Sequence, residues 1–209
     1  MKRSLMFLTT LILILLLSGC TSTSDLSQPA TVTPGVVPRL DPSPTPSGST
    51  LPLTCQVTDL NVYINEANGY CFAFPSRFTL GDQPSDKPDV RGPAIDDSAE
   101  PIHATLSVEV LPAAIDKSTR EQAEAYLKEF SVVDPATFTW SQIQIDGESA
   151  WMVEPIPAML AYRIVFVQHN GFMFRLMFWP VDIPEAQPDL NDLTQITLGS
   201  FAFIKQGVK

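Results

Sequence analysis

Residues 162–179 have the sequence YRIVFVQHNGFMFRLMFW, in which two runs of aliphatic and aromatic residues flank Asn170-Gly171. An Asn-Gly pair between two such runs predicts a β-hairpin with a two-residue turn, because both turn residues must adopt positive φ. A two-residue turn also fixes the register, so Phe166 should lie opposite Arg175. Both faces of the hairpin are apolar, which predicts central strands of a sheet that is covered on two sides.

Similar local signals predict a second hairpin and two helices. An Asp-Gly pair at 146–147 joins two runs of alternating residues between positions 138 and 154, which again predicts a two-residue turn. Ser118 and Glu121 have the spacing of a capping box, and apolar residues recur at helical spacing after them up to Phe130. A final helix is expected from Leu190 to residue 198, where a Gly-Ser pair follows it.

The second hairpin carries the candidate binding residues of the chain. Its register places Gln142 opposite Trp151 on a face with four large apolar side chains, those of Phe138, Trp140, Trp151 and Val153. A tryptophan beside an amide is typical of a platform for a sugar or a peptide, so Trp140, Gln142 and Trp151 are candidate ligand-binding residues. Large aromatic side chains are more often core residues, and a face buried beneath the helix that begins near Ser118 is the competing interpretation.

The remaining segments complete the predicted fold class. Strands are expected at 60–64, 70–74, 104–111 and 201–204, whereas the proline-rich and acidic residues 81–103 are expected to form an exposed loop or lid. Many antiparallel strands with two helices separated in sequence indicate an α+β fold. We therefore predict a twisted antiparallel β-sheet of about six to eight strands with two flanking helices.

Three stretches resemble the PsbP-like domains of bacterial lipoproteins. They are NGYCFAFPSRF at 68–78, HNGFMFRL at 169–176 and GSFAF at 199–203. They are similar to the opening Tyr-Gly-Phe-Ser-Phe-x-Tyr-Pro strand, the late Asn-Gly-aromatic hairpin and the closing Ser-Phe-x-Phe strand of that family. The resemblance implies a sandwich of antiparallel sheet with helices packed around it, and a non-enzymatic accessory or binding role. Cys71 replaces the usual small residue, and Phe78 stands where Trp is common.

The N-terminus predicts export. Lys2 and Arg3 precede an apolar run at 5–17, which at 1.5 Å per residue is too short for a hydrocarbon core of about 30 Å. A signal peptide over residues 1–19 fits this pattern. The following sequence, LSGC at 17–20, resembles the lipobox of bacterial lipoproteins, which implies cleavage before Cys20 and lipidation of that cysteine. A plain secretory cleavage site and an uncleaved anchor are the alternatives.

Composition and cysteine positions divide the exported chain into a linker and a domain. Residues 20–54 contain the predicted lipidated cysteine and a Pro/Ser/Thr-rich segment that is expected to be a disordered tether. Residues 55–209 are expected to form a single globular domain. In an oxidising compartment we expect a disulfide between Cys55 and Cys71, with two buried free thiols as the alternative.

The chain contains no recognisable catalytic or cofactor motif. Thirteen Lys+Arg against 23 Asp+Glu give a net charge of -10, which disfavours a nucleic-acid partner. The two histidines, His103 and His169, have no second ligand at metal-site spacing, so we predict no metal or cofactor. Arg175 lies among aromatic residues, where it could stack on a ring, extend to the sheet edge or line an anion pocket, and it is a further candidate ligand-binding residue.

The sequence favours a non-enzymatic, lipid-anchored protein on the extracytoplasmic side of a membrane. Its domain is expected to bind an envelope protein or a small ligand or to serve as an accessory domain. One alternative is an extracellular hydrolase that uses carboxylates of the 82–100 loop, one of which should then have a raised pKa. A purely structural role in the envelope or in assembly is the other alternative.

Overall fold

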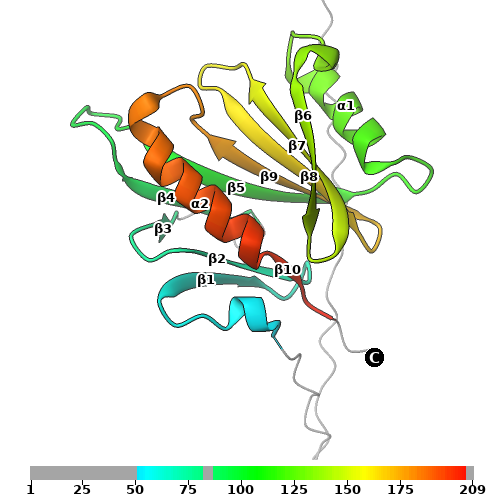
Figure 1. The fold of residues 1–209 in the computed structure, drawn as a ribbon, viewed down its shortest axis with the longest axis horizontal. Coiled ribbons are helices and arrows are strands. Elements are labelled where there is room, and N and C mark those ends of the chain that lie inside the picture. The colour runs from blue at the N-terminus through cyan, green and yellow to red at the C-terminus, as the bar shows by residue number, and fades with distance from the viewer. Residues whose placement is uncertain (1–50, 82–86, 206–209) are drawn as a thin grey trace, which may run out of the picture. The chain divides into compact units, whose positions relative to one another are not determined.

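The computed structural model describes residues 51–81 and 87–205 (Figure 1). The predicted signal peptide, Cys20 and nearly all of the predicted linker lie outside these residues. The helices are α1 (Thr119–Phe130), α2 (Gln187–Ser200) and the short 3₁₀ helices η1 (Leu53–Cys55), η2 (Pro135–Thr137) and η3 (Pro184–Ala186). The strands are β1 (Leu60–Asn65), β2 (Tyr70–Pro75), β3 (Thr79–Leu80), β4 (Asp89–Ala94), β5 (His103–Pro112), β6 (Thr139–Ile145), β7 (Glu148–Ile156), β8 (Tyr162–His169), β9 (Phe172–Trp179) and β10 (Ala202–Phe203).

Antiparallel pairing organises these strands into two sheets. The larger sheet has seven strands in the order β3-β4-β5-β9-β8-β7-β6, and the smaller has three in the order β1-β2-β10. The predicted α+β class with two flanking helices is therefore confirmed. The central strands of the larger sheet are β9 and its neighbours, as the apolar faces of the 162–179 hairpin predict. Among the described residues, no helix is both long and apolar enough to cross a bilayer.

The two faces of the larger sheet pack against different elements. Alternate residues of β8 point to opposite sides. Val165 and Val167 join the smaller sheet and α2 in one core, whereas Ile164 and Phe166 join α1 in a second core. Each face of the 162–179 hairpin is thus buried against one of the two helices, which explains why both of its faces are apolar.

Both hairpins have the predicted registers. Asn170 and Asp146 each have φ of 48°, and the glycines that follow them also have positive φ, as two-residue turns of this kind require. Phe166 lies opposite Arg175, and Gln142 lies opposite Trp151. The capping box of α1 is also present, since the Ser118 hydroxyl accepts from the Glu121 N–H while the Glu121 carboxylate accepts from the Ser118 N–H.

The prediction of a loop throughout 81–103 is wrong for residues 89–94, which form β4 between β3 and β5. This strand lacks apolar alternation, and its pairing with β5 shifts register between Arg91 and Ala94, so periodicity does not reveal it. The strand is instead packed closely against the ring of Phe78. A Cβ on Gly92 would lie 2.8 Å from a ring carbon of Phe78, so the strand depends on the absence of a side chain there.

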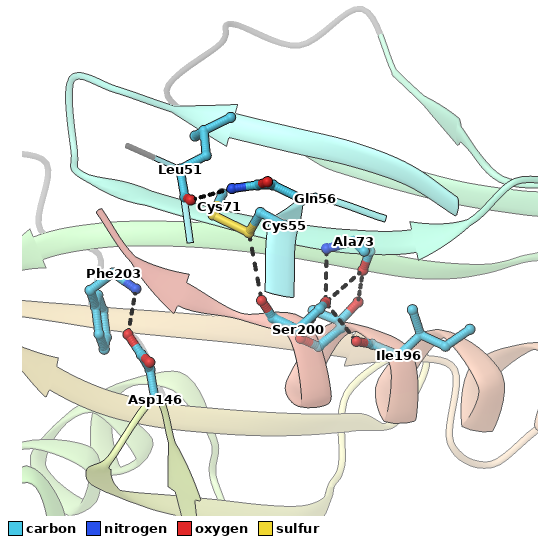
Figure 2. The surroundings of a disulfide bond; sticks show 10 residues. Leu51, Cys55, Gln56, Cys71, Ala73, Asp146, Ile196, Ser200 and Phe203 are labelled. Carbon is cyan, nitrogen blue, oxygen red and sulfur yellow. Dashed lines mark hydrogen bonds between the residues drawn. A yellow bond between two sulfur atoms is a disulfide. The ribbon is translucent and has the colours of Figure 1, made fainter. Parts of the chain in front are cut away.

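The predicted disulfide joins Cys55 of η1 to Cys71 of β2, with 6.3 Å between the Cα atoms (Figure 2). Cys71 lies in the central strand of the smaller sheet. Beside the bridge, the end of α2 is bonded to the same strand, because the Ala73 N–H donates to Ser200 Oγ at 2.8 Å. The bridge therefore fixes the start of the described domain to a buried strand.

Removal of this bridge should lower the free energy of unfolding by about 3 kcal/mol, the value that chain entropy gives for a loop of this size. The test is urea unfolding of the unanchored chain, which we define as residues 20–209 with Cys20→Ser, compared with the same chain carrying Cys55→Ala and Cys71→Ala. Reduction of the parent chain serves as the control and should produce a similar loss. Equal stability of the oxidised parent and the double variant would contradict the expectation.

Candidate functional site

The face predicted as a binding platform is packed against α1. The rings of Trp140 and Trp151 meet edge to face with centroids 6.1 Å apart, and the Arg120 guanidinium of α1 lies 4.6 Å from each centroid. The indole N–H of Trp140 donates to the Pro135 carbonyl at 2.9 Å. Phe138 and Val153 of the same face are buried in the core beneath α1. This packing matches the competing interpretation of a core face.

The register aligns all but one of the candidate ligand-binding residues in a single row across the larger sheet. Neighbouring strands place five residues in succession, Gln142, Trp151, Phe166, Arg175 and Glu109. Trp140 lies two pairs along the same hairpin, opposite Val153. Gln142 is exposed at the edge strand, where its amide donates to Ser149 Oγ at 2.9 Å. The row runs beneath α1, and its interior members are therefore shielded by that helix.

Arg175 is buried and contacts two side chains, those of Glu109 and Tyr126. Only 7% of its surface is exposed, its Nη2 donates to Glu109 Oε2, and its guanidinium carbon lies 3.9 Å from the centre of the Tyr126 ring. Burial raises the pKa of the Tyr126 hydroxyl, while the nearby positive charge of Arg175 acts in the opposite direction. Of the roles considered from the sequence, stacking on an aromatic ring is the one that this geometry supports.

Two of the acidic residues considered for hydrolysis have contacts that do not suit a general acid. The carboxylate of Asp89 accepts from Arg91 Nε at 2.9 Å within β4. Hydrogen bonds from the side chain and backbone of Ser98 hold the pKa of Asp96 below its usual value, whereas the hydrolase hypothesis requires a raised pKa. Residues 82–86, which contain two further acids, lie outside the described residues.

The two histidines have different surroundings. His103 Nδ1 lies 2.9 Å from the Gly92 carbonyl, so this ring bridges β5 to β4. His169 stacks on Phe203 with ring centroids 3.8 Å apart and an interplanar angle of 8°. In the described part of the chain, no group of three or more His, Cys, Asp or Glu side chains is arranged to hold a metal ion.

His169 borders a groove with a volume of about 500 Å³, which we call the end groove. The groove lies where three segments meet, namely the β1–β2 turn, the β8–β9 turn and the residues that follow β10. Its polar lining residues are Asn68, His169, Asn170 and Lys205. Its apolar lining comes from Phe172, Phe174 and Ile204. The Ile204 N–H donates to the Gly69 carbonyl at 2.8 Å, which ties two of these segments together.

Hydrogen bonds fix the orientation of His169 and Asn170 at the groove. His169 Nδ1 lies 2.9 Å from Glu148 Oε1, and His169 Nε2 lies 2.9 Å from Asn170 Nδ2. A carboxylate only accepts, so the proton of the imidazole belongs on Nδ1, and Nε2 accepts from the Asn170 amide. One N–H and the carbonyl of that amide then remain available to a ligand.

The end groove was not predicted as a site from the sequence, in which His169 and Asn170 mark only the end of a strand and a turn. One signal that could have indicated it is the pair of Asn-Gly sequences at 68–69 and 170–171. Phe172 directly follows the second turn, but only the structure shows that its side chain is 45% exposed. That the two turns converge depends on strand pairing far apart in the sequence.

The chain has similar proteins among solved structures. No family model and no curated protein matches the chain. The chain is similar to the solution structure of cyanobacterial PsbP (CyanoP) from Synechocystis sp. PCC 6803, with 15% identity and a TM-score of 0.47 over 76% of this chain and 99% of that chain. It is also similar to a crystal structure from Bacteroides thetaiotaomicron VPI-5482, with 11% identity and a TM-score of 0.39 over 73% of this chain and 51% of that chain.

Proposed function

We propose that the chain is a lipid-anchored extracytoplasmic protein whose α+β domain binds a ligand or an envelope partner without catalysing a reaction. The observation that carries the binding role is the end groove, in which polar groups from three segments converge beside an exposed aromatic ring. The lipobox-like sequence ending at Cys20 supports the anchor. The Cys55–Cys71 bridge supports export, because disulfides persist in oxidising compartments.

The contacts of His169 favour binding over catalysis. A general base needs its acceptor nitrogen free to face a substrate. In this structure Nε2 of His169 accepts from Asn170, while Nδ1 faces Glu148. The described lining of the groove contains no serine, threonine or cysteine that could serve as a nucleophile. The groove therefore offers donors, acceptors and apolar surface, which are the properties of a recognition site.

The anchoring part of the proposal is tested on the full chain expressed in a bacterial host. We expect the protein in the membrane fraction, released by detergent and not by salt, with an intact mass that corresponds to residues 20–209 plus a covalent lipid at Cys20. A Cys20→Ser chain is the matched control and should not carry the lipid mass. Recovery of the parent chain from the cytosol with Met1 still present would refute the proposal.

A further inference from the structure

We infer that the end groove binds the carboxylate of a ligand that carries an apolar group next to it, an inference that rests on the proposed binding role of the domain. The carboxylate would be held by Lys205 and by the amides of Asn68 and Asn170, and the apolar group would cover Phe172. Either the C-terminus of a peptide or a free organic acid has this chemistry.

The charge of the lining points to an anion. The full chain has a net charge of -10, yet the described lining of the end groove contains the ammonium of Lys205 and no carboxylate. Two acids lie close to the lining without being part of it. Glu148 is bonded to His169, and the carboxylate of Asp146 accepts from the Phe203 N–H at 2.8 Å. Within the described residues Lys205 forms none of the recorded ion pairs, so its charge is available to a ligand.

The amides supply the remaining donors. The Asn68 backbone N–H donates to Asn65 Oδ1 at 2.9 Å, which fixes the position of this turn, and no hydrogen bond of the Asn68 side chain is recorded. Asn170 retains one amide N–H after its contact with His169. A carboxylate accepts several hydrogen bonds, and those that involve a charged group are the strongest, so one ammonium and two amides suit it.

The apolar part of the lining determines which chemical group of the ligand can lie next to its carboxylate. Phe172 is 45% exposed, whereas Phe174 is buried at the base of the groove. Covering the Phe172 ring removes apolar surface from water, which favours a ligand with an aromatic or aliphatic group. A volume of about 500 Å³ suits a small organic acid or the last two or three residues of a peptide.

Two smaller described grooves do not offer the same combination. In the groove of about 410 Å³, Arg91 is paired with Asp89, and Glu100 adds a negative charge to the lining. In the groove of about 330 Å³, the charged lining residue is Asp182, whose carboxylate accepts from the Ala161 N–H. An unpaired cation beside exposed aromatic surface therefore distinguishes the end groove among the described grooves.

The test measures binding of matched acids and amides to the unanchored chain by calorimetry. The probes are 3-phenylpropionate and the tripeptide Ala-Ala-Phe, each compared with its amide. We expect each acid to bind at least about tenfold more tightly than its amide, because a charge-assisted hydrogen bond is lost. A Lys205→Met variant should lose a similar factor, whereas Lys128→Met on α1 should bind as the parent does.

The outcomes separate the inference from the proposed function. Stronger binding of the tripeptide than of 3-phenylpropionate identifies a peptide terminus as the ligand, and equal binding identifies a free acid. Equal affinity for acid and amide, no loss in Lys205→Met, or no binding of either acid at millimolar concentration overturns the inference. If the amides bind and Phe172→Ser abolishes that binding, the groove is still a recognition site and the proposed function stands.

Discussion

Replacing Phe72 by alanine is expected to lower the free energy of unfolding by about 4 kcal/mol, because the truncation leaves a cavity that the surrounding rings cannot fill. Phe72 lies in β2 and is fully buried. Its ring is nearly parallel to that of Phe201 at 6.2 Å and contacts that of Tyr63 at 5.4 Å. The residue thus links the smaller sheet to the segment that follows α2.

Urea unfolding of the unanchored chain measures this loss. Phe172→Ala is the matched control, since it removes the same side chain from an exposed position and should change stability by less than about 1 kcal/mol. Retention of parental stability in Phe72→Ala would show that the smaller sheet is not packed as the structure describes. The same control variant also establishes that changes at Phe172 report on binding and not on folding.

The three sequence stretches quoted for the PsbP-like resemblance meet in the core around Phe72. Each of the three matching stretches contributes rings to this core: Tyr70 and Phe72 from the first, Phe174 from the second, and Phe201 and Phe203 from the third. Their rings contact one another across segments, as in the pairs Tyr70–Phe201 and Phe174–Phe203. The aromatic residues of these stretches therefore serve packing, and they say little about what the domain binds.

Features that depend on neighbouring residues were predictable from the sequence, and features that depend on distant pairing were not. Turn chemistry sets both hairpin registers, and a capping box sets the start of α1. The strand at 89–94 is held by Phe78 and β5, so its own sequence carries no periodic signal. The end groove depends on the pairing of β10 with β2, which joins residues more than a hundred positions apart.

The row of candidate binding residues across the larger sheet was also predictable only within each hairpin. The sequence placed Gln142 opposite Trp151 and Phe166 opposite Arg175, and both pairs are present. It could not show that β7 pairs with β8 and β9 with β5, which extends the two pairs into one row beneath α1. Only this extension places Glu109 beside Arg175 and so gives the buried guanidinium a carboxylate partner.

Replacing Glu109 by glutamine is expected to lower the free energy of unfolding by about 3 kcal/mol, because it leaves the charge of Arg175 buried without its carboxylate. Glu109 also pairs with Lys87 at 3.3 Å, but Lys87 is largely exposed. Lys87→Met therefore serves as the matched control and should cost less than about 1 kcal/mol.

A second change distinguishes an unpaired charge from lost packing. Adding Arg175→Met to Glu109→Gln removes the buried charge while keeping an unbranched side chain against the Tyr126 ring. Because an uncharged pair of similar volume often replaces a buried ion pair without loss, the double variant should recover most of the stability that the single change removes. If instead it is no more stable than Glu109→Gln alone, Arg175 stabilises the domain through its contact with Tyr126, and its pairing with Glu109 is secondary.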